Sequence, residues 1–197
     1  MLVTDDRLLA GRDPIALALA AERGGVTSVQ LRLKHASARE LVAVAREMIA
    51  ALTIPVLVND RPDVAIAAGA AGVHLGPDDL PVGMARRIAP PDFVIGVSVG
   101  SEDEASLGAP ADYWGIGPWR TTFTKADAGS GLGAGGFARL RALAGGRPCL
   151  AIGGIIPADV PLVLAAGGAG VGVASGILGG DDVEEAARRY GEKAVRR

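Results

Sequence analysis

Short apolar segments alternate with helix-like segments along the whole of this 197-residue chain. The apolar segments have the composition of buried strands, and helical spacing or capping residues mark the segments between them. The expected strands cover residues 1–4, 28–32, 55–58, 72–75, 93–99, 113–118, 149–155 and 170–175. Strict alternation predicts a parallel sheet with right-handed crossovers. Eight such units predict an α/β fold, a single-domain (β/α)₈ TIM barrel over residues 1–197.

An open, doubly wound sheet is the alternative to a closed barrel. It would have edge strands, whereas nearly every expected strand here is a continuous apolar run, as buried parallel strands are. The segment AAGAAGV at residues 67–73 also returns as AAGGAGV at residues 165–171, about half a chain later. Similar helix ends can arise by convergence, so this repeated segment gives only modest support to a closed barrel built from two related halves.

The composition excludes several classes of partner. A net charge of −2 provides no basic surface for nucleic acid, and no apolar run reaches the length that a membrane span needs. The first residues, MLVTDDRLLAGRD, lack the pattern of a secretory signal. Cys149 lies in an apolar run and is expected to be a buried strand residue. We therefore expect a cytoplasmic protein with no nucleic-acid or membrane partner, and a homo-oligomer stays open.

Two aspartates follow neighbouring strands. Asp60 ends the segment VLVND, and Asp79 follows the strand GVHL. Parallel strands carry their carboxyl ends at one edge, so the two carboxylates should lie side by side. A divalent cation with a phosphorylated substrate would relieve their repulsion, because Mg²⁺ takes one or two carboxylates together with phosphate oxygens. The alternative is that both aspartates are helix caps or turn residues.

Cationic and polar side chains are expected at the same edge. Gln30 and Arg32 alternate with Leu31, so both should face the barrel interior, where an arginine needs an anion. Arg32, Lys34 and Lys125 together with two carboxylates form a lining suited to a diphosphate and Mg²⁺. Each lysine taken alone is more often a solvated surface residue. The combination favours binding.

A second anion site is expected at the last two strands. Gly153-Gly154 follows the seventh strand and Ser175-Gly176 the eighth. Glycine-rich turns at these positions, opening onto helix N-termini, form the common phosphate site of barrels. The glycine-rich segment 121–135 is too long for a plain connection, which indicates a functional loop.

These residues resemble the motifs of the thiamine-phosphate synthase family from end to end. The matching segments are Gln30-Leu31-Arg32-Leu33-Lys34 (family Gln-Leu-Arg-x-Lys), Asn59-Asp60-Arg61, Val73-His74-Leu75-Gly76-Pro77-Asp78-Asp79 (family Val-His-Leu-Gly-Gln-x-Asp), Gly96-Val97-Ser98, Gly117-Pro118 with Thr122-Phe123-Thr124-Lys125, and Ala151-Ile152-Gly153-Gly154-Ile155. Each motif alone is weak, but their order and spacing are specific. The resemblance implies a transferase that couples hydroxymethylpyrimidine diphosphate to a thiazole phosphate, releases diphosphate and uses Mg²⁺.

The resemblance also implies a role for each matching residue. The pyrimidine diphosphate would be held by Gln30, Arg32, Lys34, Asn59, Ser98 and Lys125. The thiazole phosphate would be held by Thr122, Phe123, Thr124, Gly154, Ala174 and Ser175. Asp60 and Asp79 would ligate Mg²⁺. The family reaction is a dissociative substitution that requires no protein base, and Lys125, Ser98 and Arg32 would be its catalytic residues. His74 is then expected to be a barrel-facing or packed structural residue, and His35 a loop residue.

The chain departs from the family pattern at four places. Pro77 replaces a glutamine, Leu33 replaces a glutamate, Val99-Gly100-Ser101 replaces Ala-His-Thr, and Trp119-Arg120-Thr121 replaces an apolar stretch that ends in proline. None removes a ligand named above. Arg120 puts the conformation of the loop before Thr122 in question, and Gly100 is expected to alter the shape of the pocket.

Two other functions stay open at this point. One is a thiazole tautomerase, which shares this barrel in related proteins. Tautomerisation needs a positioned base, and the resembling tautomerases carry a histidine where this chain has Gly100. The tautomerases also tend to lack an aspartate at the position of Asp79, which favours the synthase. The segment Ser175-Gly176-Ile177-Leu178 points the other way, since it looks somewhat more like the corresponding segment near the end of the tautomerase sequences. The other is a non-catalytic barrel that binds a phosphorylated ligand. The synthase is favoured because a glycine cannot act as a base.

Overall fold

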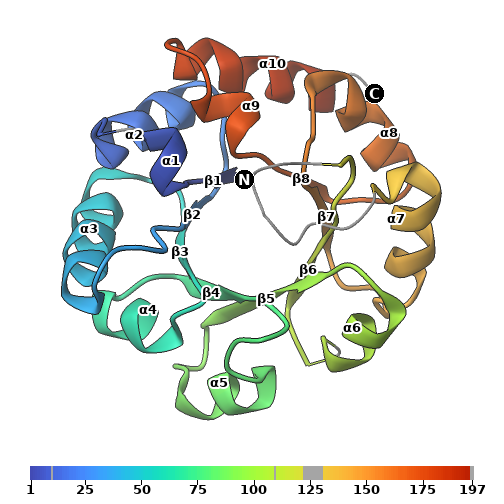
Figure 1. Cartoon of the computed structure of the whole chain (residues 1–197), viewed down its shortest axis with the longest axis horizontal. Helices are drawn as coiled ribbons and strands as arrows, with labels where there is room; N and C mark the ends of the chain where they lie inside the picture. Colours follow the sequence, from blue (N-terminus) through green and yellow to red (C-terminus); the bar gives the residue numbers. More distant parts are fainter. Residues whose placement is uncertain (10, 109, 122–130, 196–197) are drawn as a thin grey trace.

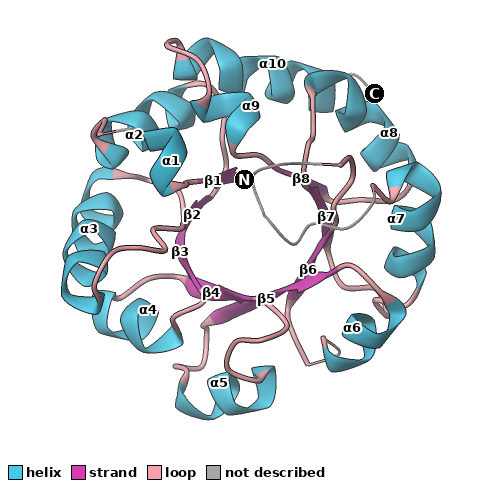
Figure 2. Cartoon of the chain, in the orientation of Figure 1, coloured by secondary structure: helices cyan, strands magenta, loops and turns pink. Residues whose placement is uncertain are grey.

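The computed structural model describes residues 1–9, 11–108, 110–121 and 131–195. Eight strands form one sheet in the order β1 to β8, with every neighbouring pair parallel. Figure 1 looks down the ring of strands, with the helices arranged around its outside, and Figure 2 shows the same two concentric layers by type of structure. The strands are β1 Leu2–Val3, β2 Val29–Leu31, β3 Val56–Asn59, β4 Gly72–Leu75, β5 Val94–Val99, β6 Tyr113–Ile116, β7 Cys149–Ile152 and β8 Gly170–Gly172.

Helices follow the strands in sequence. They are α1 Asp6–Leu9, α2 Pro14–Arg23, α3 Ala38–Ala51, α4 Pro62–Ala68, α5 Val82–Ile88, α6 Glu102–Leu107, α7 Gly133–Ala142, the 3₁₀ turn η1 Pro157–Asp159, α8 Val160–Ala165, α9 Ser175–Leu178 and α10 Val183–Val195. No helix in these described ranges is long and apolar enough to cross a membrane.

The first and last strands close the ring. Leu2 pairs in parallel with Val173, just beyond β8. The Val3 N–H donates to the Val173 carbonyl at 2.8 Å, and the Val173 N–H donates to the Met1 carbonyl at 3.0 Å. The predicted (β/α)₈ TIM barrel is confirmed, and the open-sheet alternative is wrong.

Local signals in the sequence set several helix starts. Ser37 and Glu40 form a capping box at the start of α3, with the Ser37 N–H donating to Glu40 Oε2 at 2.8 Å. Ser101 caps α6, accepting from the Glu104 N–H at 3.2 Å. The repeated AAG segments are the ends of α4 and α8, where Gly69 and Gly167 both adopt left-handed φ values of +77° and +82°. A glycine adopts that conformation at low cost, which explains the repeat.

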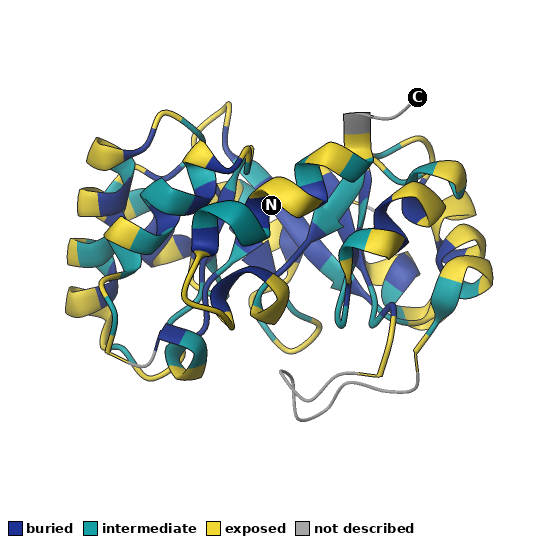
Figure 3. Ribbon diagram, turned by 90° about the horizontal axis from the view of Figure 1, so that it is seen from above, coloured by how far each residue is buried: buried dark blue, intermediate teal, exposed yellow. Residues whose placement is uncertain are grey.

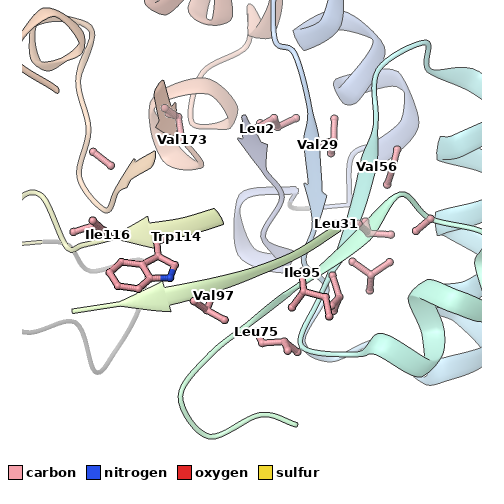
Figure 4. Packing of buried hydrophobic residues seen from close by; sticks show 14 of the residues in the cluster. Leu2, Val29, Leu31, Val56, Leu75, Ile95, Val97, Trp114, Ile116 and Val173 are labelled. Carbon is pink, nitrogen blue, oxygen red and sulfur yellow. The ribbon is translucent and has the colours of Figure 1, made fainter. Parts of the chain in front are cut away.

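Alternate strand residues build the core between the sheet and the helices. Figure 4 shows this layer, in which Val29, Leu31, Leu75, Ile95 and Trp114 point away from the barrel axis and are buried. Figure 3 shows the barrel from the side, with buried strands at its centre and exposed residues on the outer faces of the helices. Successive side chains of a strand point to opposite faces of the sheet. Because the apolar residues point into this layer, the strand residues between them face the barrel interior, where polar side chains can be accommodated.

The structure differs from the sequence expectation at several element ends. The short helices α1 and α9 were not predicted, because four residues are too few to show helical periodicity. Helix α7 begins at Gly133, inside the glycine-rich segment 121–135 that was predicted to be a loop, although glycine is a poor helix former. Backbone bonds from Leu132 to Pro118 and from Gly133 to Trp119, at 2.8 and 3.0 Å, hold that start in place. Strand β7 stops at Ile152 rather than residue 155, because Gly153 and Gly154 both take positive φ.

Candidate active site

A cavity of about 550 Å³ opens where the carboxyl ends of the strands meet. This volume lies in the usual range of small-molecule sites. The cavity is lined by these predicted site residues: Gln30, Arg32, Lys34, Asn59, Asp60, Asp79, Ser98, Gly154, Ala174 and Ser175. The described residues of the two predicted anion sites therefore line one cavity. Thr122, Phe123, Thr124 and Lys125 lie outside the described residues, and their roles stay predictions.

Asp60 and Asp79 form an acidic pair on one wall of this cavity. Lys34 Nζ lies 3.6 Å from Asp60 Oδ2. Asp79 Oδ2 accepts from the Gly76 N–H at 2.6 Å. Burial, and the carboxylate of Asp60 next to it, raise the pKa of Asp79 above its usual value, against the opposing effects of the Gly76 N–H and Lys34. The neighbouring placement predicted from sequence is confirmed.

The backbone at Asp60 is unusual. Its φ of +64° makes it the one non-glycine residue with positive φ among the described residues. The Asp60 N–H donates to the carbonyl of His74 on the neighbouring strand at 2.8 Å, which holds the residue in place. Aspartate tolerates this conformation better than most residues, but it still costs free energy. Such conformations cluster at functional sites, so the geometry favours a functional role for Asp60 over a simple turn.

The acidic pair suits a hard divalent cation. Within the part of the chain that the structure describes, no group of three or more acidic, histidine or cysteine side chains could hold a metal. Two carboxylates alone fit Mg²⁺, which keeps several water or phosphate oxygens among its ligands. A bound cation would offset both effects that raise the pKa of Asp79, its burial and the neighbouring carboxylate of Asp60.

Arg32 has a carboxylate partner that the sequence analysis did not identify. Arg32 Nη1 donates to Asp5 Oδ2, and the two side chains are only 16% and 9% exposed. Thr4 Oγ1 accepts from the Arg32 N–H at 2.7 Å, which fixes β2 against the end of β1. The guanidinium has five N–H donors, so it can also bind a ligand anion in the cavity. Asp5 lies two residues after the end of β1, and its place near a strand end was the available signal.

A hydrogen-bonded group spans the floor of the cavity. His74 Nδ1 lies 2.9 Å from Tyr113 Oη, and His74 Nε2 lies 3.0 Å from Ser98 Oγ. Burial raises the pKa of Tyr113, against the opposing effect of a hydrogen bond with Gln30. The expectation of a barrel-facing, packed His74 is confirmed. Its contact with Ser98, and the part played by Tyr113, were not predicted, because residues on four different strands meet here.

Glycines make room for this group. The Cβ of an alanine at Gly96 would lie 2.0 Å from Tyr113 Cζ. At Gly115 it would lie 3.0 Å from His74 Cε1. Each distance is too short for an ordinary contact, so the rings of Tyr113 and His74 occupy the volume that side chains on β5 and β6 would otherwise fill.

The opposite wall is built from backbone turns. Gly153 and Gly154 follow β7 with φ values of +83° and +67°. Ala174 and Ser175 follow β8, and Ser175 begins α9. Tyr190 of α10 supports both turns, donating to the Ile155 carbonyl at 2.9 Å and lying so close behind Gly176 that an added Cβ would be 2.0 Å from its hydroxyl oxygen. The predicted glycine-rich wall is therefore present and supported from outside the cavity.

The departures from the family pattern are accommodated without loss of the cavity. Pro77 and Gly100 line it, and the Gly100 N–H donates to Glu104 Oε2 at 2.6 Å. Leu33 packs against the hydrophobic core. Trp119 is buried edge-on against Phe137, with ring centroids 5.8 Å apart. His35 is an exposed loop residue, as predicted, with Nδ1 3.2 Å from Asp6 Oδ2.

Comparisons with known proteins agree with one another. The family model described as thiamine monophosphate synthase matches residues 1–177. The thiamine-phosphate synthase of Azorhizobium caulinodans is 47% identical over 192 residues, which cover 95% of this chain and 90% of the relative. That of Methanoculleus marisnigri is 48% identical over the same shares of the two chains.

Solved structures give the same result. A thiamine phosphate pyrophosphorylase from Pyrococcus furiosus superposes with a TM-score of 0.85 at 34% identity, covering 98% of this chain and 94% of that one. A 3-hexulose-6-phosphate synthase superposes with a TM-score of 0.69 at 17% identity, covering 98% of each chain. At that identity the likeness shows the fold alone.

Proposed function

The chain belongs to the thiamine monophosphate synthase family, a family of transferases, and we propose that its cavity joins hydroxymethylpyrimidine diphosphate to a thiazole phosphate. The products are thiamine phosphate and diphosphate. The observation that carries this proposal is the meeting, in one cavity, of an acidic pair, two cations and a glycine-rich turn wall. These are the groups that a diphosphate with its cation and a separate phosphate require.

The pyrimidine diphosphate is assigned to the wall formed by β2 to β5. Gln30, Asn59 and Ser98 supply polar atoms from three strands, and Lys34 and Arg32 supply positive charge. Ser98 is oriented by His74 at 3.0 Å, and Arg32 is held by Asp5. These contacts mean that the polar groups are in position before the ligand enters, which avoids a cost of reorganisation on binding. Lys125, assigned to the diphosphate from sequence, belongs to the same proposal.

Asp60 and Asp79 are the residues that would hold Mg²⁺. When bound, the cation would supply charge neutralisation for the diphosphate oxygens. The lysine beside the pair, Lys34, lies close enough to Asp60 to bind an oxygen of the same anion. The metal site and the cationic residues therefore serve the same ligand.

The thiazole phosphate is assigned to the opposite wall. The backbone of Gly154 lies in a left-handed turn, and the backbone of Ala174 and Ser175 lies at the start of α9. Both segments are assigned to contact the phosphate. Small residues allow a phosphate to approach the backbone closely. Thr122, Phe123 and Thr124, assigned from sequence, complete the proposed set.

The proposed chemistry needs charge stabilisation rather than a base. As the bond to the diphosphate breaks, negative charge grows on the leaving oxygens, where Arg32 and Lys34 stabilise it, together with Lys125 as predicted from sequence. Ser98 orients the pyrimidine end. The thiazole nitrogen then bonds to the pyrimidine methylene carbon. Gly100, where the resembling tautomerases have histidine, has no side chain that could accept a proton.

The partners that follow are small phosphorylated molecules. Nucleic acid and membrane are not proposed as partners, since the net charge is −2 and no helix in the described ranges could span a bilayer. We place the protein in the cytoplasm on the sequence arguments above, and a homo-oligomer stays open.

The metal part of this proposal has a direct test. Thiamine phosphate formation is measured against Mg²⁺ concentration for the wild type, Asp60→Ala and Asp63→Ala. Asp63 is a matched control because its exposed carboxylate binds Arg61 at 2.6 and 2.8 Å rather than facing the cavity. We expect Asp60→Ala to lose most activity and Asp63→Ala to keep it. If Asp60→Ala keeps near wild-type turnover at limiting Mg²⁺, Asp60 is a turn residue and not a ligand.

A further inference from the structure

Arg120 and Asp159 form a two-point ion pair behind the glycine-rich wall. Arg120 Nε lies 2.9 Å from Asp159 Oδ2, and Arg120 Nη2 lies 2.5 Å from Asp159 Oδ1. The Asp159 side chain is 1% exposed, whereas that of Arg120 is 51% exposed. Neither residue lines the cavity. Burial alone would raise the pKa of Asp159, but the hydrogen bonds from Arg120 and the Ile156 N–H outweigh it and bring that pKa below its usual value.

The same aspartate holds the turn that follows β7. Asp159 Oδ2 accepts from the Ile156 N–H at 3.0 Å. One residue earlier, the Ile155 carbonyl accepts from Tyr190 Oη at 2.9 Å. The outer half of the turn, residues 155–156, is thus fixed from behind by two side chains that belong to η1 and α10.

Arg120 holds the inner half of the turn through its own backbone. The Arg120 N–H donates to the Gly153 carbonyl at 3.0 Å. At Gly154 an added Cβ would lie 2.8 Å from Arg120 Cβ, so the two residues are in direct contact. A shift of Arg120 would therefore pass to Gly153 and Gly154, which form the cavity wall.

We propose that Arg120 is a positioning residue, whose ion pair with Asp159 holds residues 153–156 in the shape that receives the thiazole phosphate. This inference rests on the proposed function, since it assigns that phosphate to the glycine-rich wall. The side chain joins the segment after β6 to η1 after β7, so one contact fixes two neighbouring loops of the barrel. A planar guanidinium is suited to this task because its fork matches both carboxylate oxygens, which a lysine cannot do.

The test compares Arg120→Gln, Arg120→Lys and Asp159→Asn with the wild type in steady-state assays. KM is measured separately for the thiazole phosphate and the pyrimidine diphosphate, and unfolding in urea is followed in parallel. We expect Arg120→Gln and Asp159→Asn to raise KM for the thiazole phosphate by roughly tenfold, the lower end of the effect that supporting contacts have at metal sites. KM for the pyrimidine diphosphate should change less than about twofold, because that ligand is assigned to the far wall.

Two further variants separate positioning from general stability. Arg120→Lys keeps the positive charge beside Asp159, so it should raise KM for the thiazole phosphate less than Arg120→Gln does. Arg86→Gln is the matched control, because Arg86 Nη2 binds Asp112 at 2.6 Å and Asp112 in turn accepts from the Ile95 N–H, but at the amino end of the strands. Arg86→Gln should lower the free energy of unfolding without changing the ratio of the two KM values.

The inference is overturned if the Arg120 and Asp159 variants unfold more easily but keep both KM values, or raise both equally. Asp159→Asn preserves the shape of the side chain, so it keeps the test usable if Arg120→Gln does not fold. A wild type that forms no thiamine phosphate would instead refute the proposed function. The inference would then be judged by calorimetric binding of the thiazole phosphate alone, and equal affinity in the wild type and Asp159→Asn, or no binding to either, would overturn it.

Discussion

Replacing Gly96 with alanine should damage both the barrel and the site, by an amount that follows from the structure. Gly96 pairs with Tyr113 across β5 and β6. An added Cβ would lie 2.0 Å from Tyr113 Cζ, whereas ordinary contacts begin at 3.4 Å, so the ring must withdraw by about 1.4 Å. Overpacking of this kind costs ~1–3 kcal/mol. Displacing the Tyr113 hydroxyl also weakens its 2.9 Å contact with His74, which adds ~1 kcal/mol.

The expected loss for Gly96→Ala is therefore about 2–4 kcal/mol in the free energy of unfolding, measured in urea. Turnover should fall as well, because His74 orients Ser98. Gly83→Ala is the control, since nothing lies within 4 Å of its added Cβ, and it should leave stability unchanged or slightly raised. If Gly96→Ala unfolds within ~0.5 kcal/mol of the wild type with normal turnover, the packing argument is wrong.

Three more perturbations test other contacts. Asp5→Asn removes the partner of the Arg32 charge, and it should cost ~1–3 kcal/mol in urea unfolding, between the values for exposed and buried pairs; no measurable cost would contradict the contact. Asp79→Asn should abolish most turnover yet leave the melting temperature unchanged or higher, because the raised pKa of Asp79 shows that burial and Asp60 disfavour its charge; a marked drop in melting temperature would contradict this. The stability advantage of the wild type over Asp159→Asn should persist above about pH 4 and shrink as the pH falls further, because the folded-state pKa of Asp159 is lowered; an advantage that grows on acidification would refute that assignment.

Much of the fold could be predicted from sequence because its signals are local. The capping box at Ser37 and Glu40 lies within one turn of helix, and it set the start of α3. Asp60 and Asp79 follow neighbouring strands, so parallel topology alone was enough to bring their carboxylates together. Arg32 was predicted to face inward by its alternation with Leu31, and it does line the cavity.

The rest depends on contacts between distant segments. Asp5 meets Arg32 across 27 positions in the sequence, and Arg120 meets Asp159 across 39. The position of Tyr113 beneath His74 requires the register between β4, β5 and β6. Periodicity and capping rules do not predict such pairs. The pairs form only when the barrel closes and the strand register places particular inward-facing side chains at the same height along the barrel axis.

Phosphorus NMR with both substrates is the most direct test of the central claim that this cavity couples two phosphorylated molecules. With hydroxymethylpyrimidine diphosphate, a thiazole phosphate and Mg²⁺ present, diphosphate and thiamine phosphate should appear in equal amounts, and a chelator should stop both. Isomerisation of the thiazole ring without release of diphosphate, or binding of both molecules without any product, would contradict the account.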